Sequence, residues 1–118
     1  MKVTDVIRIL DAKVVTGSVQ PEDEVSSAFG ADLMSDVLAF VRDNTLILTG
    51  MVNAHVIRTA EMLDVRFIMF VRGKEPSEEM IAMAEEEDMV LMSTSHTLFT
   101  SSGLLYMNGL KSCSREED

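Results

Sequence analysis

Three short apolar runs recur along this chain, and each is followed by a polar or glycine-containing loop and then by a helix-like stretch. The runs span 45–50, 66–71 and 89–93. They start about 22 residues apart, a spacing that suits a strand, a loop and a short crossover helix. Units of this kind build a parallel sheet with its polar loops at one edge, which is where open α/β sheets bind ligands. This repeated spacing therefore predicts the position of a binding site better than it predicts the function of that site.

Length, charge and cysteine content narrow the class of protein. The 118 residues suit one domain, which we expect to span 1–111, followed by a disordered polar tail over 112–118. A net charge of −10 argues against nucleic acid or an anionic membrane as a partner, because phosphate contacts need a basic face. The one cysteine cannot form an internal disulfide, no apolar signal core opens the chain, and no apolar run approaches about 18 residues. We therefore expect a cytoplasmic protein.

Helix and strand signals fill the rest of the chain. Apolar residues at helical spacing predict helices over 4–11, 33–41, 54–64, 76–87 and 98–110. The expected caps or first-turn residues of these helices are Thr4, Asp32, Asn53, Pro76 and Thr97. Two further strands are expected over 12–16 and 24–29. Alternation of strands and helices in this order predicts an α/β fold.

The loop after the first apolar run is the strongest candidate for a binding site. Thr49 and Gly50 end the run, and Asn53 opens the next helix. A helix that begins after a glycine loop presents free backbone N–H groups and a positive dipole end, which favour an anion. The alternative is that Gly50 only permits a tight turn and Asn53 only caps the helix. Neither a dinucleotide fingerprint nor a P-loop is present.

Two further loops would lie at the same edge of the sheet. Arg72 and Lys74 are cations in the loop after the second run, and Gly73 permits close backbone approach. The loop after the third run is dense in hydroxyl groups, with Thr94 and Thr97 among them. These side chains could bind a ligand, or they could be a solvated turn and a helix cap.

A fourth polar element precedes the first run. Asp32, Ser35 and Asp36 could line a pocket or hold a cation, or they could serve as caps and surface residues. The two histidines, His55 and His96, lack the spacing of a zinc site. A Ser35–His96–Asp36 triad can be drawn on paper, but nothing in the spacing requires it. We therefore expect neither a metal site nor a cofactor.

Most of the chain resembles the DRTGG domain, which is similar to the N-terminal domain of HPr kinase/phosphorylase. The resemblance runs from about Asp32 to Leu105, and the opening stretch 2–17 fits the small stand-alone members of the family. The segments that carry the resemblance are Leu46–Gly50, Val56–Ala60, Phe67–Pro76, Met80–Glu86 and Val90–Thr94, followed by Thr97.

The resemblance implies a three-layer α/β domain in which helices flank a small, mostly parallel sheet. It also implies self-association as a homodimer and a regulatory role beside CBS, phosphotransacetylase or pyrophosphatase domains, in some cases near an adenine-nucleotide site. The Asp-Arg-Thr-Gly-Gly string that names the family is absent, since Met51, Val52 and Asn53 follow Gly50. Arg58 or Arg72 is then the cation expected to meet a phosphate.

These observations together predict a non-catalytic regulatory module that is dimeric and acts on a partner protein. Its expected ligand is an adenine nucleotide or another anionic small molecule. The expected ligand-binding residues are Asp32, Ser35, Thr49, Gly50, Asn53, Arg58, Arg72, Gly73, Thr94 and Thr97. Two alternatives stay open: an interaction or scaffold subunit of a metabolic or redox complex without a small ligand, and a small phosphotransferase that would use His96 and Asp36.

Overall fold

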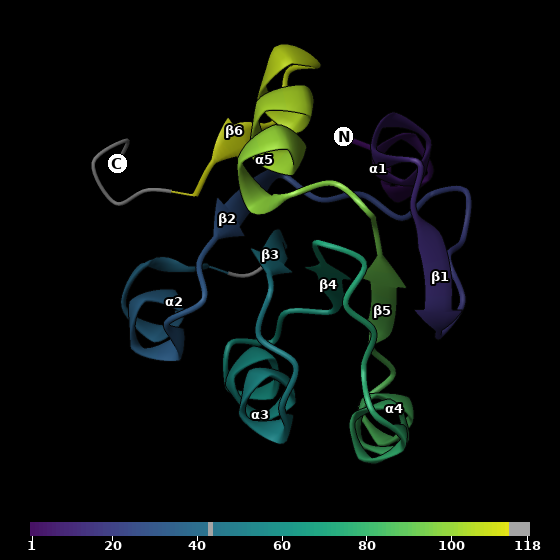
Figure 1. Ribbon diagram of the computed structural model, residues 1–118, viewed down its shortest axis with the longest axis vertical. Coiled ribbons are helices and arrows are strands. Elements are labelled where there is room, and N and C mark those ends of the chain that lie inside the picture. Colours follow the sequence, from purple (N-terminus) through teal and green to yellow (C-terminus); the bar gives the residue numbers. More distant parts are fainter. Residues whose placement is uncertain (43, 114–118) are drawn as a thin grey trace.

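The chain folds into three layers, with one six-stranded sheet between two layers of helices (Figure 1). The computed structural model describes residues 1–42 and 44–113. The strand order is β1-β5-β4-β3-β2-β6, in which β1 runs antiparallel to β5 and all other neighbours are parallel. The strands are β1 (Lys13–Thr16), β2 (Ser27–Gly30), β3 (Thr45–Thr49), β4 (Phe67–Phe70), β5 (Val90–Ser93) and β6 (Lys111–Ser112). The expected three-layer, mostly parallel α/β fold is confirmed.

The two faces of the sheet are covered by different helices. The helices are α1 (Val3–Leu10), α2 (Met34–Phe40), α3 (Ala54–Met62), α4 (Glu78–Glu86) and α5 (Leu98–Met107). Figure 1 shows α2, α3 and α4 on one side of the strands and α1 and α5 on the other. Because side chains alternate along a strand, Ile47 faces the first helix layer, whereas Leu46 and Leu48 face the second. All three runs are buried on both faces, which explains their continuous apolar character.

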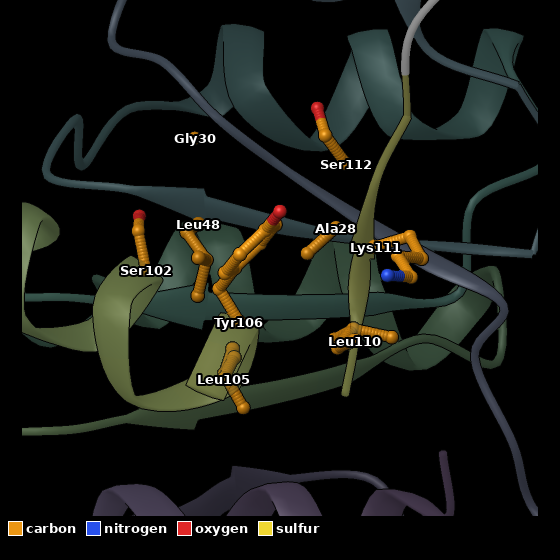
Figure 2. A pocket seen from close by; sticks show the side chains of 9 residues that line it. All are labelled: Ala28, Gly30, Leu48, Ser102, Leu105, Tyr106, Leu110, Lys111 and Ser112. Carbon is orange, nitrogen blue, oxygen red and sulfur yellow. The ribbon is translucent and has the colours of Figure 1, made fainter. Parts of the chain in front are cut away.

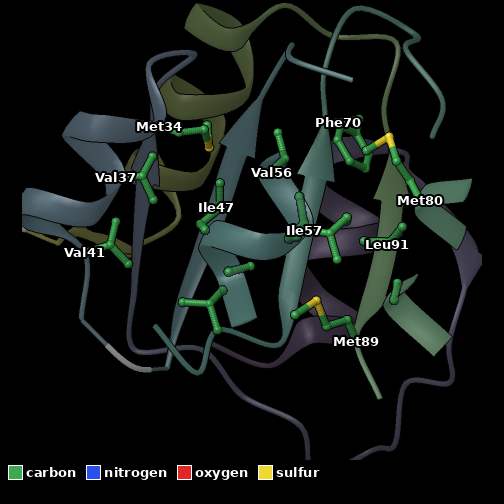
Figure 3. Packing of buried hydrophobic residues seen from close by; sticks show 14 residues of the cluster. Met34, Val37, Val41, Ile47, Val56, Ile57, Phe70, Met80, Met89 and Leu91 are labelled. Carbon is green, nitrogen blue, oxygen red and sulfur yellow. The ribbon is translucent and has the colours of Figure 1, made fainter. Parts of the chain in front are cut away.

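Each of these two interfaces holds a separate hydrophobic core. In the core under α2, α3 and α4, Ile57 and Phe70 are fully buried and Met80 is nearly so (Figure 3). In the core under α1 and α5, Leu10 is fully buried and Leu105 is nearly so. Methionines occur in both cores, and their flexible side chains suit irregular packing.

The helices that connect the strands lie on one face of the sheet up to β5 and on the opposite face after it. Helices α2, α3 and α4 connect successive strands on one face, whereas α5 crosses the opposite face to bring the chain to β6 beside β2. The connections that leave β4 and β5 therefore lie on opposite faces. In an open α/β sheet, this switch point is where a crevice for a ligand usually forms.

Two N-terminal segments differ from the expectations. Thr4 does not cap the first helix, because α1 begins at Val3 and the preceding residue, Lys2, makes no side-chain cap bond. The strand expected over 24–29 begins only at Ser27, because the backbone at Val25 exchanges hydrogen bonds of 2.9 Å with Met1 instead. These hydrogen bonds hold Met1 beside Val25.

Residues near the end of the described chain are also part of the fold, which the sequence did not predict. Ser112, expected in the polar tail, lies in β6, and Cys113 is buried with its N–H donating to the carbonyl of Ala28 at 2.9 Å. The rest of that expected tail, 114–118, lies outside the described residues.

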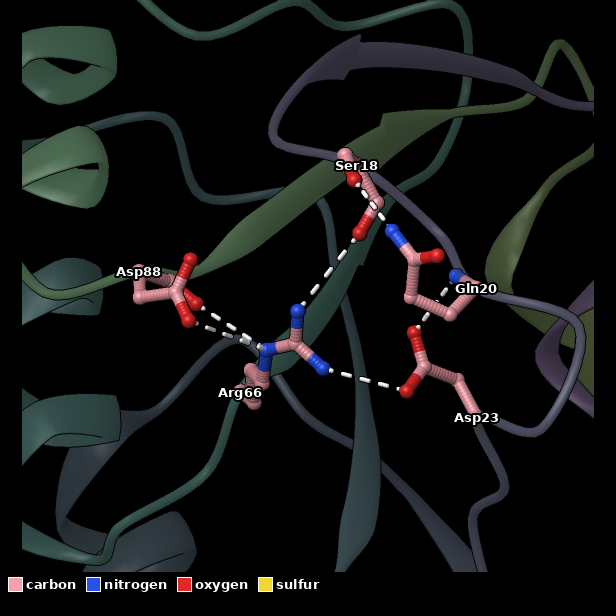
Figure 4. Close-up of polar contacts among 5 residues, drawn as sticks. All are labelled: Ser18, Gln20, Asp23, Arg66 and Asp88. Carbon is pink, nitrogen blue, oxygen red and sulfur yellow. Dashed lines mark hydrogen bonds and ion pairs between the residues drawn. The ribbon is translucent and has the colours of Figure 1, made fainter.

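Arg66 connects three loops at the amino end of the sheet (Figure 4). Its guanidinium forms an ion pair with Asp23 at 3.2 Å and donates to the carbonyls of Asp88 at 3.1 Å and Ser18 at 3.5 Å. It also lies over the ring of Phe67. This cluster joins these loops at the end of the sheet opposite the candidate site.

Within the described residues, no helix combines the length and apolar character needed to cross a membrane.

Candidate functional site

Asp32, Thr49 and Gly50 form a hydrogen-bonded cluster at the carboxyl end of the central strands. Asp32 Oδ1 accepts hydrogen bonds from Thr49 Oγ1 at 3.1 Å and from the N–H of Gly50 at 2.8 Å. Thr49 is fully buried, and its hydroxyl also accepts from the N–H of Met51 at 3.1 Å. Asp32 was expected to cap the following helix or to lie in its first turn. It does neither, because its carboxylate is bound to the end of β3, and α2 has no side-chain cap bond.

Arg72 lies across this cluster. An ideal Cβ at Gly50 would come within 2.5 Å of Arg72 Nη2 and 2.8 Å of its Cζ. The glycine that allows a close approach is therefore Gly50, whereas the surroundings of Gly73 are open and its φ of +69° is the reason for glycine there. Among the described residues, the guanidinium of Arg72 has no hydrogen bond or ion pair.

The loops at the switch point are bonded to each other. The N–H of Arg72 donates to the carbonyl of His96, and the N–H of Gly73 donates to the carbonyl of Thr94, both at 2.8 Å. Thr94 is 2% exposed, and its hydroxyl donates to the carbonyl of Leu10 at 2.7 Å. Backbone bonds thus join the loops where a crevice would open. Thr94 is thus buried and its hydroxyl proton is bonded within the fold, and its predicted role in ligand binding stays a prediction.

Two predicted site residues act as helix caps, as their sequence position also predicts. Asn53 accepts from the N–H of Val56 at 3.3 Å, and Thr97 accepts from the N–H of Thr100 at 3.2 Å. The remaining two, Ser35 on α2 and Arg58 on α3, are exposed. Neither has a hydrogen bond or ion pair to the Asp32 cluster in the described part of the chain.

The arrangement supplies complementary polar groups. Asp32 keeps its Oδ2 unbonded among the described residues, so it can accept from a hydroxyl or amine donor. Arg72 offers a planar cation for a phosphate or carboxylate. No hydrogen bond within the described chain joins Ser35, His96 and Asp36 into a triad, and no group of three or more metal-ligating side chains occurs there.

A small cleft lies beside the end of β2, between α5 and the sheet (Figure 2). Its volume is about 130 Å³. Leu48 and Leu105 line its apolar part, and Lys111 lies over the ring of Tyr106 at 5.7 Å. Pockets for drug-sized ligands usually measure about 300–1,000 Å³, so this cleft suits a group the size of one side chain. Sequence reasoning missed it because its lining comes from distant segments and carries no chemical motif.

The sequence and the fold can both be matched to known proteins. The family model described as the DRTGG domain matches residues 5–107. The chain belongs to the DRTGG domain family. The family assignment based on the strand ends and helix starts is thereby confirmed, although the string that names the family is absent. A comparison with curated proteins found no match.

A solved structure shares the DRTGG fold. It contains the CBS and DRTGG domains of the regulatory region of Clostridium perfringens pyrophosphatase, complexed with the activator diadenosine tetraphosphate. The sequences are 18% identical, the TM-score is 0.68, and the match covers 88% of this chain. The chain corresponds to 45% of the length of that structure, which is therefore a larger assembly of domains.

Proposed function

We propose that this DRTGG domain is a non-catalytic regulatory module that binds an anionic small molecule at the carboxyl ends of β2, β3 and β4. The observation that carries the proposal is the guanidinium of Arg72, which lies over Gly50 without a described partner, while the N–H of Gly50 donates to the carboxylate of Asp32. A cation and a hydrogen-bond acceptor that both contact Gly50 suit a ligand that has both a negative charge and hydrogen-bond donors.

An adenine nucleotide is the ligand that we propose to test first. Its phosphate would meet Arg72, and its ribose hydroxyls or amino group would donate to Asp32. The N–H of Gly50 is already bonded to Asp32, so the phosphate would depend on the side chain of Arg72 more than on the loop backbone. The regulatory region of the related pyrophosphatase structure holds an adenine dinucleotide, which supports this choice.

The remaining parts of the proposal concern assembly and setting. We propose a homodimer in the cytoplasm that acts on a partner protein and has no enzymatic activity of its own. The DRTGG domain of the related structure belongs to a regulatory region, which supports the regulatory role. We propose one folding unit that extends past 111 to at least Cys113, because β6 (Lys111–Ser112) pairs with β2 and Cys113 is buried.

Ligand titration of the Arg72→Ala variant tests the site. We expect adenine nucleotides to raise the melting temperature of the unaltered protein in a saturable manner, because a ligand that binds the native state stabilises it. Loss of a charge-assisted contact should weaken that binding about tenfold or more. Calorimetric titration with AMP, ADP, ATP and inorganic phosphate measures both effects.

Arg8→Ala is the matched control, because Arg8 is an exposed cation on α1 that forms only a surface ion pair with Asp5 at 3.3 Å. Its nucleotide affinity should equal that of the unaltered protein. Equal affinity in the Arg72→Ala variant would show that the site is elsewhere. No binding of any of these anions to the unaltered protein would refute the ligand proposal and favour an interaction subunit.

A further inference from the structure

Helix α5 differs from α1, α2, α3 and α4 because it carries no charged side chain. Its ten residues, Leu98–Met107, contain only apolar, hydroxyl-bearing and glycine residues. Each of α1, α2, α3 and α4 contains at least one Asp or Glu. In a chain with a net charge of −10, an uncharged helix at the surface is unusual and indicates a face that is covered in use.

Two faces of α5 are apolar, and only one of them meets the core. Ser101 and Leu105 are buried against the sheet. Phe99 is 89% exposed and Met107 is 82% exposed, so these two large side chains lie on the outer side, whereas Tyr106, at 66% exposed, borders the cleft with Lys111 over its ring. Exposed apolar residues occur singly on most surfaces, but Phe99 and Met107, with Tyr106 beside them on the same short helix, form a patch.

The outer face has a regular spacing centred on Gly103. Phe99 precedes Gly103 by four residues and Met107 follows it by four, so all three lie along one side of the helix. A Cβ placed at Gly103 would meet nothing within 4 Å, so this position faces open space. A glycine at the centre of such a row lets another helix approach closely.

We propose that α5 packs antiparallel against α5 of a second copy of this chain, across a two-fold axis at Gly103. A two-fold axis there would place Phe99 against the partner's Met107 and Met107 against the partner's Phe99. Contacts between aromatic rings and methionine sulfur are favourable. The row is thus complementary to itself, as an interface between identical copies requires. This inference rests on the homodimer of the proposed function but not on its ligand site.

Charge favours a second copy as the occupant, and the exposed side chains supply about half of the area that a stable interface needs. Two chains that each carry a charge of −10 repel one another, so they can meet most readily through the helix that has no charge. The three exposed side chains offer on the order of 450 Å² per copy. A stable interface buries about 800 Å² per partner, so polar neighbours such as Thr100 and Asn108 would supply its rim.

The Phe99→Glu variant tests the interface. Sedimentation velocity at chain concentrations from about 1 to 200 μM spans the dissociation constants expected for this size of interface. We expect the unaltered protein to dimerise and Phe99→Glu to weaken the dimer about tenfold or more, because a buried carboxylate would lack a partner. An unaltered protein that stays monomeric over this range would overturn the inference.

A second substitution tests the antiparallel register. Adding Met107→Lys to Phe99→Glu should restore the dimer, because the carboxylate introduced in each copy would face the ammonium group introduced in the other. Within one helix these two positions are about 12 Å apart along the axis, so the new charges cannot pair in the same chain. Failure of the double variant to recover would overturn the proposed register.

The exposed residue Met62 on α3 provides the matched control, since it is 72% exposed and belongs to a helix on the other face of the sheet. Met62→Glu should leave the dimer unchanged, and loss of the dimer in this variant instead of Phe99→Glu would overturn the choice of α5. Melting temperatures of all variants confirm that they fold. Nucleotide titration measures binding and sedimentation measures the mass of the assembly. Failure of the ligand proposal would therefore leave the dimer result unaffected.

Discussion

At the scale of single residues, two glycines are expected to respond differently to one added methyl group. In Gly50→Ala the three atoms nearest to the methyl would all belong to the guanidinium of Arg72, the far end of a flexible side chain. In Gly17→Ala it would lie 2.6 Å from the backbone oxygen of Met89, at a φ of +89° that disfavours alanine. We therefore expect Gly50→Ala to lower the free energy of unfolding by less than about 1 kcal/mol and Gly17→Ala by about 2 kcal/mol or more.

Chemical denaturation measures both stabilities, and nucleotide titration of Gly50→Ala supplies the functional comparison. Because the methyl displaces the guanidinium of Arg72, this variant should bind nucleotide more weakly while remaining folded. A loss of stability in Gly50→Ala as large as that in Gly17→Ala would mean that Arg72 cannot move away from Gly50.

At the scale of elements, removing a helix cap that the structure contains should destabilise the protein, whereas changing a residue that was only expected to cap should not. Asn53 accepts from the N–H of Val56, whereas Thr4 lies inside the first turn of α1 and forms no cap. Asn53→Ala should therefore lower the free energy of unfolding by about 1 kcal/mol, as loss of an N-cap usually does. Thr4→Ala is the control and should cause no loss, because alanine is the better helix former. Urea denaturation resolves the two, and equal effects would contradict this assignment of caps.

Sequence patterns predicted elements well where local signals are strong. The central strands follow from apolar runs buried on both faces, and the caps Asn53 and Thr97 follow from helix starts. Strand β6 has only two residues, too few for a pattern of alternating side chains to be detected. It forms because it pairs with β2, which the sequence does not reveal. The contact of Asp32 with Thr49 joins residues 17 apart, and the contact of Arg72 with Gly50 depends on neighbouring strands. The candidate residues could therefore be named from the sequence, but their contacts could not.

At the scale of the whole molecule, the net charge of −10 makes a prediction about self-association. Repulsion between two such chains acts over about 30 Å at 10 mM salt but only about 8 Å at physiological ionic strength. An interface made by the uncharged helix α5 has no attractive ion pairs for salt to weaken. We therefore expect the dimer to become several-fold stronger as NaCl rises from about 10 to 150 mM, as measured by sedimentation.

The double variant with Phe99→Glu and Met107→Lys provides the internal comparison for this salt response. Its dimer would depend on two ion pairs between the copies, and screening weakens these while it also weakens the long-range repulsion. The gain with salt should therefore be smaller than in the unaltered protein, although both chains have the same formal net charge. If the unaltered dimer instead weakened with salt, charged side chains would hold it together, and the uncharged face of α5 could not be the interface.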